Sequence, residues 1–384
     1  MTIVIPQELL PTSSFSCGPA QALPHVRQTP LYRTLFERNH RAEDISSSGL
    51  LRQTTENLRT LLHVPHDYTI LFFPGGATAA MDAVLWSLTQ DTLSGIDMGA
   101  FSHLWCQKLA ASVPGIKRNF VHAGKDFIPQ SDPDFKASLV ILTPNETSTG
   151  VQLPNAFLER AWQARGEETL IAWDATSCAG GRDLPASQYD VMLFSLQKCF
   201  GAGGGTAAVI LSPRAVKRIE EVKKMRQIPY FLDLSHALAF APKYQTLNTP
   251  SIINIWICNE SCKWMLSKGG IKTMEQICRR HADYLTAWAQ QSTWVRPLIA
   301  NADYRSFTTM TFEIISPALT GETIAQTLLQ TGRPNLADGL KKYRTLDKNS
   351  FRVACFPFID PDGQEQYKKL TAALDFMAQR LMQN

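Results

Sequence analysis

The chain lacks the sequence features of a membrane or exported protein. No apolar run approaches the roughly 20 residues that a helix needs to cross a bilayer. Residues 1–6, MTIVIP, do not show a basic stretch followed by a long apolar one, so we expect no signal peptide. Internal repeats and low-complexity linkers are also missing. The sequence therefore predicts a cytoplasmic globular protein without a membrane partner.

A strong excess of one charge is missing as well. The chain has 38 Lys and Arg against 34 Asp and Glu, a net charge of +4 over 384 residues. A balance this small does not by itself indicate nucleic acid as a partner. An anionic small-molecule substrate remains compatible with it, because binding such a substrate depends on a local cluster of charge.

The eight cysteines show no repeated spacing. Cys258 and Cys262 are four residues apart on a predicted helix, but no further zinc ligands lie near them in the sequence. We therefore expect reduced thiols, as in a cytosolic protein, and no metal site.

The length and the order of the predicted elements indicate an α/β protein of two domains. A chain of 384 residues is too long for one small core. Strands and helices alternate through the first half, a pattern typical of a mostly parallel sheet with crossover helices. We expect a large domain over residues 20–270 and a smaller α+β domain over residues 271–384, with residues 1–19 packing against the smaller one.

Hydrophobic periodicity predicts the individual elements. Helices are expected at residues 43–62, 79–88, 155–164, 213–225, 252–268, 272–289, 322–330 and 364–382. Strands are expected at residues 69–73, near 96, and at 137–142, 170–173, 191–194, 206–211, 308–315 and 351–356. The helix over residues 213–225 is rich in Lys and Arg, and we interpret its charged run as a solvated face.

Lys198 is the first candidate for chemistry. It lies just beyond an apolar run, residues 191–194, and a glycine-rich turn follows it. Poor hydration at such a position favours the neutral amine, which is a nucleophile for carbonyl groups and forms a Schiff base with them. The alternative is a surface lysine at the end of a strand. A Walker-type phosphate loop does not fit, because here the lysine precedes the glycines.

Asp174 strengthens the functional interpretation of Lys198. It ends another short apolar run, residues 170–173. In open sheets of this kind ligands bind beyond the carboxyl ends of the strands, where both side chains are expected. A lysine and a carboxylate are the pair that pyridoxal phosphate needs, one for its aldehyde and one for its pyridine nitrogen. The alternative for Asp174 is a helix or turn cap.

Seven short motifs then resemble one known family. They are Asn39-His40-Arg41, Pro74-Gly75-Gly76-Ala77-Thr78, Pro144-Asn145-Glu146-Thr147, Asp174, Gln197-Lys198, Asn248-Thr249-Pro250 and Phe351-Arg352-Val353. With these motifs the chain resembles the class V aminotransferases of fold type I, and among them the phosphoserine aminotransferases. The motifs extend over nearly the whole chain and keep the family's order.

The resemblance implies pyridoxal 5′-phosphate as cofactor. Lys198 would hold its aldehyde and transfer protons as general base and acid, and Asp174 would stabilise the pyridinium. Phe101 would stack on the ring, with Trp105 as the competing aromatic one helical turn away. The other implied contacts are Ala77, Thr78, Thr147 and Gln197, together with Asn248 and Thr249 from the partner chain of a homodimer.

Thr78 departs from the family's pattern. Better-known bacterial relatives usually carry Arg at this position, which follows a strand and opens a helix. A threonine offers the cofactor phosphate a hydroxyl and a helix-start amide, but no charge. Some balancing charge must then come from elsewhere.

Three residues are implied in substrate binding. His40 and Arg41 would hold a distal phosphate or γ-carboxylate, and Arg352 the α-carboxylate. Arg352 lies in a predicted apolar strand, where a structural ion pair is the alternative. The family's second His-Arg pair is not matched, since Tyr343-Arg344 stands near its place at a shifted spacing.

The implied reaction is reversible amino transfer between L-glutamate and 3-phosphonooxypyruvate, giving O-phospho-L-serine and 2-oxoglutarate. A second role of the family, on a phosphorylated intermediate of pyridoxine synthesis, stays open. The alternatives are another class V enzyme, of the serine–glyoxylate aminotransferase or cysteine desulfurase type, and a non-catalytic protein of the same fold. A desulfurase needs a reactive cysteine on a mobile loop, which neither Cys199 nor Cys355 provides. Lys198 and Asp174 together argue against a non-catalytic protein.

Overall fold

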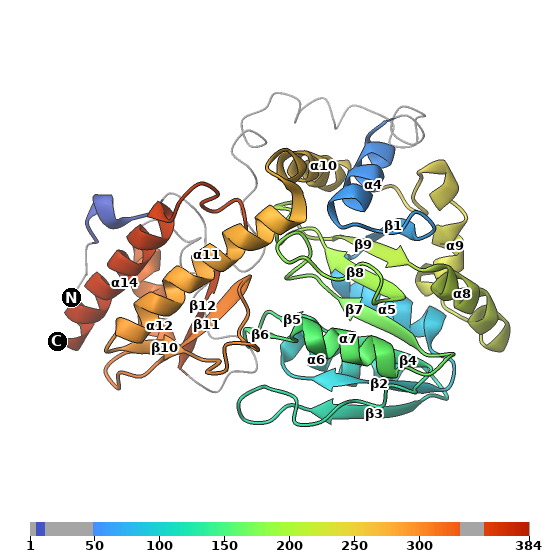
Figure 1. The fold of residues 1–384 in the computed structure, drawn as a ribbon, viewed down its shortest axis with the longest axis horizontal. Helices are drawn as coiled ribbons and strands as arrows, with labels where there is room; N and C mark the ends of the chain where they lie inside the picture. The colour runs from blue at the N-terminus through green and yellow to red at the C-terminus, as the bar shows by residue number, and fades with distance from the viewer. Residues whose placement is uncertain (1–4, 12–48, 331–348, 384) are drawn as a thin grey trace.

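A computed structural model describes residues 5–11, 49–330 and 349–383. Its main feature is a seven-stranded sheet in the order β1-β9-β8-β7-β4-β2-β3 (Figure 1). The strands are β1 (Thr69–Pro74), β2 (Thr92–Asp97), β3 (Lys117–His122), β4 (Leu139–Leu142), β7 (Leu170–Asp174), β8 (Val191–Ser195) and β9 (Thr206–Leu211). Only β9 runs against its neighbours, so the predicted mostly parallel α/β sheet is confirmed.

Alternate residues of each strand point to opposite faces of this sheet, and helices cover both faces. In β7, Ile171 and Trp173 pack on one side, and Leu170 and Ala172 on the other. The first face is covered by α4 (Leu50–Leu61), α7 (Asn155–Ala164) and α10 (Ile252–Ser267). The second is covered by α5 (Gly76–Leu88), α8 (Pro213–Met225) and α9 (Leu234–Leu238). The strands are therefore buried along their length, which explains their continuous apolar runs.

A second, antiparallel sheet of three strands lies apart from the first (Figure 1). It consists of β10 (Val295–Pro297), β11 (Thr309–Ile314) and β12 (Ser350–Ala354). The helices beside it are α12 (Gly321–Gln330) and α14 (Glu365–Met382), and α11 (Gly270–Gln291) runs to it from the end of α10. The short η1 (Gln7–Leu9) lies against α14. The expected domain boundary at residues 270–271 falls at the start of α11.

Short elements complete the described part of the chain. They are α6 (Ala100–His103), the π-helical turn η2 (Leu104–Leu109), the 3-10 turns η3 (Ala110–Ser112), η4 (Tyr230–Leu232) and η5 (Ala241–Lys243), and the hairpin of β5 (Asn145–Glu146) and β6 (Val151–Gln152). The sequence did not predict β3, β10 or this hairpin. In β3 the reason is its position, since this edge strand is largely exposed and has no apolar run.

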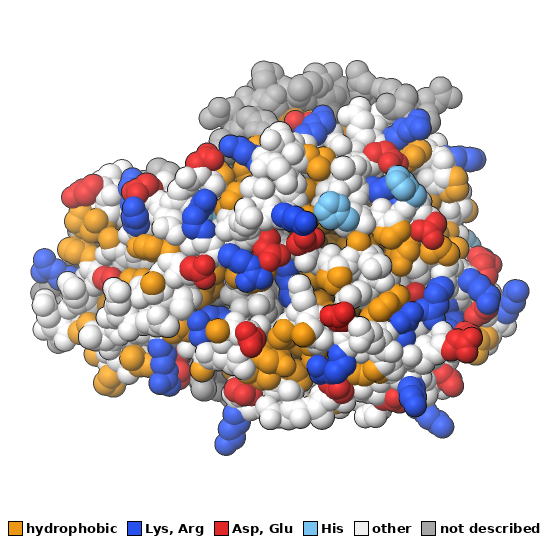
Figure 2. Space-filling model, in the orientation of Figure 1, with side chains coloured by type: hydrophobic (Ala, Val, Ile, Leu, Met, Phe, Trp, Pro, Cys, Tyr) orange, Lys and Arg blue, Asp and Glu red, His pale blue; other side chains and the backbone are white. Residues whose placement is uncertain are grey.

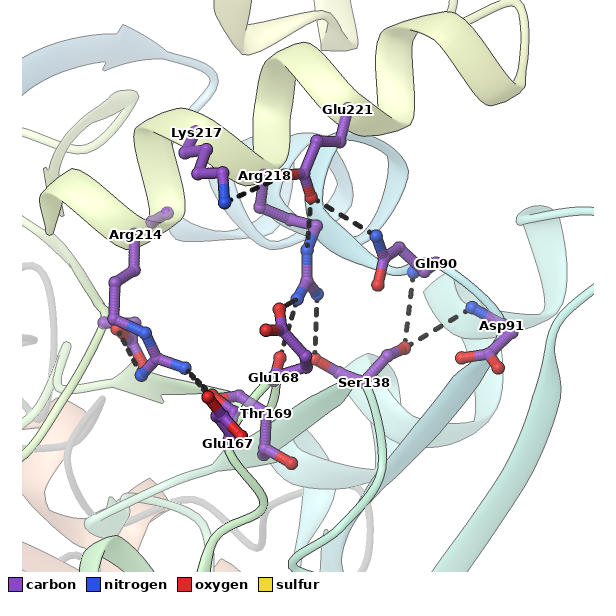
Figure 3. Close-up of polar contacts among 12 residues, drawn as sticks. Gln90, Asp91, Ser138, Glu167, Glu168, Thr169, Arg214, Lys217, Arg218 and Glu221 are labelled. Carbon is purple, nitrogen blue, oxygen red and sulfur yellow. Dashed lines mark hydrogen bonds and ion pairs between the residues drawn. The ribbon is translucent and has the colours of Figure 1, made fainter.

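The interpretation of α8 as a helix with a solvated charged face holds for Lys217, which is exposed, but is wrong for Arg218 (Figure 3). Arg218 is buried and donates to the carbonyl oxygens of Ser138, at 3.2 Å, and Glu168, at 2.6 Å. Two further arginines do the same at neighbouring loops: Arg214 binds the carbonyls of Glu167 and Thr169, and Arg226, just after α8, those of Thr89 and Gln90. These carbonyls directly precede β4, β7 and β2, so the arginines tie three strand starts to one helix.

The surface agrees with the small net charge. Basic and acidic side chains are interspersed over the face shown in Figure 2. In the described ranges, no helix combines the length and the apolar character needed to cross a membrane. The seven cysteines described are buried and form no disulfide.

Candidate active site

The carboxyl ends of β1, β2, β4, β7 and β8 meet at one edge of the large sheet. The residues that follow these ends line a cavity of about 290 Å³. Of the residues predicted to bind the cofactor, those that line it are Ala77, Thr78, Phe101, Thr147, Asp174, Gln197 and Lys198. Side chains up to 121 residues apart in sequence (Ala77 and Lys198) thus border one space, as expected for an open α/β sheet.

One wall of the cavity is the turn from β1 into α5. Gly75 and Gly76 have positive φ angles, 88° and 70°, which glycine adopts without strain. The amide of Gly75 donates to the carbonyl of Gly205 at 2.9 Å and fixes the turn against the residue before β9. The first amides of α5, with Ala77 and Thr78, therefore border the cavity, and helix-start amides favour an anion.

Asp174 is the last residue of β7 and is buried. Its Oδ1 accepts hydrogen bonds from the amide of Thr176, at 3.0 Å, and from the Thr176 hydroxyl, at 2.5 Å. Burial raises the pKa of Asp174 to about 6, although the two bonds from Thr176 oppose this shift. A carboxyl group that titrates near neutrality thus borders the cavity.

Lys198 follows β8 and is 7% exposed. The turn that carries it is closed by two backbone bonds, from Gly201 to the carbonyl of Lys198 (2.9 Å) and from Ala202 to that of Leu196 (3.1 Å). Next to it, the Ser195 hydroxyl donates to Oε1 of Gln197. The strand end therefore holds the lysine at a defined place on the cavity wall.

Of the two aromatic candidates, only Phe101 lines the cavity. It belongs to α6, a single turn that continues into η2. Trp105 is buried in the core beneath α5. The geometry therefore favours Phe101 as a ring that a flat ligand could contact.

Arg352 is not among the residues that line the cavity, but it contacts one of them. It is buried in β12, and its Nη1 donates to the carbonyl of Thr147 at 3.2 Å. The contact joins the three-stranded sheet to the loop after β4.

The other predicted site residues are Asn248, Thr249, His40 and Arg41. Asn248 and Thr249 are exposed on the loop before α10 and do not line this cavity. His40 and Arg41 fall outside the described residues, as does Arg344.

Sequence reasoning gave no role to three polar side chains of the cavity, Asn145, Thr176 and Ser195. Asn145 stands in a motif quoted above, and Thr176 two positions after Asp174, so both had a signal by proximity. Ser195 is the last residue of a buried strand, one position beyond the apolar run. The sequence at this position does not indicate whether the side chain lines a cavity or only belongs to the turn.

A larger hollow, about 870 Å³, lies at the three-stranded sheet between β11 and α12. Its described walls are mainly apolar, with Ile315, Leu319 and Leu329, and Glu322 is their one ionisable residue. They offer no pair of acid and base, whereas Asp174 and Lys198 both border the smaller cavity.

The family model of the class V aminotransferases ("Aminotransferase class-V") matches residues 31–332. The chain belongs to this family. The match spans the large sheet and every motif of the cavity described above, and it confirms the family resemblance noted in the sequence.

Relatives of this class V aminotransferase match it over nearly its full length. A phosphoserine aminotransferase of Rhodococcus opacus is 30% identical over 99% of both chains. One of Corynebacterium glutamicum is 31% identical over 97% of this chain and 96% of its own. Among solved structures, a phosphoserine aminotransferase from Cytophaga hutchinsonii has a TM-score of 0.82 at 25% identity and covers 94% of this chain and 98% of its own. A ureidoglycine–glyoxylate aminotransferase of Bacillus subtilis shares the fold, with a TM-score of 0.77 at 19% identity over 98% of this chain and 94% of its own.

Membership makes this class V protein an aminotransferase that uses pyridoxal phosphate. The donor set of the cavity fits that cofactor. It offers an amine for an aldehyde, a buried carboxyl group for a ring nitrogen, an aromatic ring and helix-start amides for a phosphate.

Proposed function

We propose that this aminotransferase interconverts L-glutamate and 3-phosphonooxypyruvate with 2-oxoglutarate and O-phospho-L-serine. The observation that carries the proposal is the full-length similarity to phosphoserine aminotransferases, at 30% and 31% identity. The cavity supports the chemistry, because a lysine and a buried carboxyl group border the same space.

Bound pyridoxal phosphate supplies an electron-accepting ring that stabilises negative charge on the substrate carbon. Lys198 would hold the cofactor aldehyde through its Nζ, and the same nitrogen would move a proton at the substrate α-carbon as general base and acid. Asp174 bonds the ring nitrogen and keeps it protonated, while Thr176 orients its carboxylate. Phe101 would stack on the cofactor ring, and Thr147 would contact the cofactor from the same cavity. Ala77, Thr78 and Gln197 bind on the phosphate side.

Arg352 binds the α-carboxylate of either substrate. Burial restricts its guanidinium, and the bond to the Thr147 carbonyl fixes its orientation. His40 and Arg41 bind the distal phosphate or γ-carboxylate, an assignment that rests on the family resemblance.

The active site is shared in a homodimer. Asn248 and Thr249 are exposed and do not line their own cavity, which suits a contact with the cofactor phosphate of the partner chain. We place the enzyme in the cytoplasm and in serine biosynthesis, with a pyridoxine-pathway step as a further role.

The competing function is that of another class V enzyme. A desulfurase is disfavoured because burial raises the pKa of Cys199 well above its usual range, so that this thiol is a poor nucleophile. Two solved structures with this fold are aminotransferases named for glyoxylate. The alternative to test is therefore glyoxylate, in place of 3-phosphonooxypyruvate, as the amino acceptor.

The test is amino transfer from L-glutamate to 3-phosphonooxypyruvate, compared with transfer to glyoxylate and pyruvate. We expect kcat/KM for the phosphorylated acceptor to exceed the others by at least about a hundredfold, since charged bonds to the phosphate are lost with them. Arg41→Ala should remove most of that preference and leave the absorbance of the bound cofactor unchanged. A preference for glyoxylate would move the enzyme to another class V activity.

A further inference from the structure

Glu146 is a fully buried carboxylate for which the chemistry above has no use. It lies in β5, between the cavity residues Asn145 and Thr147. Its Oε2 accepts from the amide of Ser102 at 2.8 Å and lies 2.9 Å from the Ser102 hydroxyl. Its Oε1 accepts from the amide of Ser148 at 3.0 Å and from the Ser148 hydroxyl at 2.7 Å. A longer contact, 3.5 Å, joins Oε1 to the amide of Phe101.

These bonds connect the loop after β4 to the turn that carries Phe101. Ser148 strengthens the connection, because its Oγ also accepts from the amide of Ala100 at 2.8 Å. Gly99 shows how close the two segments are. A Cβ added there would collide with the Glu146 side chain and lie 2.6 Å from Ser148 Oγ.

A buried carboxylate is costly, and a neutral Ser, Asn or Thr would satisfy the amides of a short turn at lower cost. Glu146 reaches both segments at once, through two oxygens that together bind donors from residues 101, 102 and 148. The two cavity residues that it connects are Phe101, through its backbone, and Thr147, its neighbour in the chain.

We propose that Glu146 is a positioning residue that fixes the ring of Phe101 and the backbone of Thr147 against the bound cofactor. The inference rests on the cofactor site proposed above, and it adds a residue that acts through Phe101 instead of touching the cofactor. Neutralising Glu146 should therefore loosen the cofactor even though every contacting side chain remains.

The test uses the full chain with Glu146→Gln, which keeps the shape but turns an NH2 group toward amide donors. We expect the Kd for pyridoxal phosphate to rise about tenfold, because bonds to a buried charge are lost. The visible circular dichroism of the bound cofactor should weaken, since that signal needs a fixed ring.

The matched control is Glu275→Gln in α11. Like Glu146, Glu275 accepts a hydrogen bond from a backbone amide, that of Asp183 at 2.7 Å. It does not line the cavity. Its variant should change Kd less than twofold.

A double-mutant cycle separates positioning from a general loss of stability. In a Phe101→Ala background, Glu146→Gln should raise Kd only about twofold, because the ring that it positions is gone. Ser148→Ala, which removes one acceptor of the Ala100 amide, should raise Kd about threefold and serves if Glu146→Gln does not fold.

Two results would overturn the proposal. One is wild-type Kd and circular dichroism in Glu146→Gln or Ser148→Ala. The other is an undiminished tenfold loss in the Phe101→Ala background, which would mean that Glu146 does not act through Phe101. If the wild-type chain itself fails to bind pyridoxal phosphate, the cofactor site is wrong and this inference falls with it.

Discussion

Asp174 shows at the scale of one residue how the fold tunes the group proposed to bind the cofactor's ring nitrogen. Burial disfavours its charged form, and the amide and hydroxyl of Thr176 restore part of the balance. The pKa of about 6 leaves the carboxylate ionised at neutral pH, where it can pair with a protonated ring nitrogen.

This balance predicts a pH dependence of cofactor binding. As pH falls through about 6, Asp174 gains a proton and loses its attraction for the pyridinium, so affinity for pyridoxal phosphate should fall. Thr176→Val removes a bond that lowers this pKa, so the midpoint should move to higher pH. The measurement is Kd for the cofactor, by titration of the cofactor-free protein between pH 5 and pH 8.

Asp174→Asn is the control for that titration. It should bind more weakly at pH 7.5 and lose the dependence near pH 6, because the group that titrates is gone. A Thr176→Val profile that coincides with wild type would show that Thr176 does not tune Asp174.

The sequence was sufficient to predict that Lys198 and Asp174 border one space, because each lies just beyond a buried apolar run at the end of a strand. It was not sufficient for Glu146, whose partners on α6 lie 44 and 45 residues away. Bonds of this kind depend on which loops meet at the sheet edge, and no local pattern contains that information.

At the scale of elements, α8 holds the amino ends of three strands together. Its bounds, Pro213–Met225, follow from periodicity and from Pro213 at the first helical turn. The burial of Arg218 does not, since its acceptors at Ser138 and Glu168 lie 80 and 50 residues away. A run of Lys and Arg predicts a charged helix face, but it does not predict which of these side chains is buried and donates to backbone carbonyl groups.

Arg218→Ala should therefore destabilise the fold without touching the active site. We expect the free energy of unfolding to fall by about 2–3 kcal/mol, because one buried and one partly buried carbonyl oxygen lose a charged donor. Lys217→Ala is the matched control on the same helix, since Lys217 is exposed and pairs only at 3.6 Å with Glu221. Urea denaturation checks both, and equal stabilities of the two variants would contradict this role.

At the scale of the whole molecule, two sheets meet at the active site. Ser306 donates to the carbonyl of Gly150 at 2.9 Å, and Arg352 to that of Thr147 at 3.2 Å. A Cβ at Gly150 would lie 2.6 Å from Thr311 Oγ1 of β11, so the loop after β4 packs directly on the three-stranded sheet. The mostly parallel sheet and the α+β character of the smaller domain were predictable. The strand order and this junction were not, because both depend on contacts between residues far apart in the sequence.

The junction makes a prediction about Arg352. Arg352→Lys keeps the charge but not the planar fork, so KM should rise about tenfold for both L-glutamate and O-phospho-L-serine, which share the α-carboxylate. Arg41→Ala should instead impair the phosphorylated substrate more strongly. Steady-state kinetics with both substrates, together with an unchanged Kd for the cofactor, check this division. A change in KM for only one substrate in Arg352→Lys would contradict it.

The most direct test of the whole account is the absorbance of the cofactor-loaded protein before and after addition of O-phospho-L-serine. We predict a band of lysine-bound cofactor that is lost in Lys198→Ala and that phosphoserine converts to the amine form in the wild type. A band that responds to alanine or glutamate but not to phosphoserine would contradict the proposed substrate. Absence of any lysine-bound band would contradict the role of Lys198.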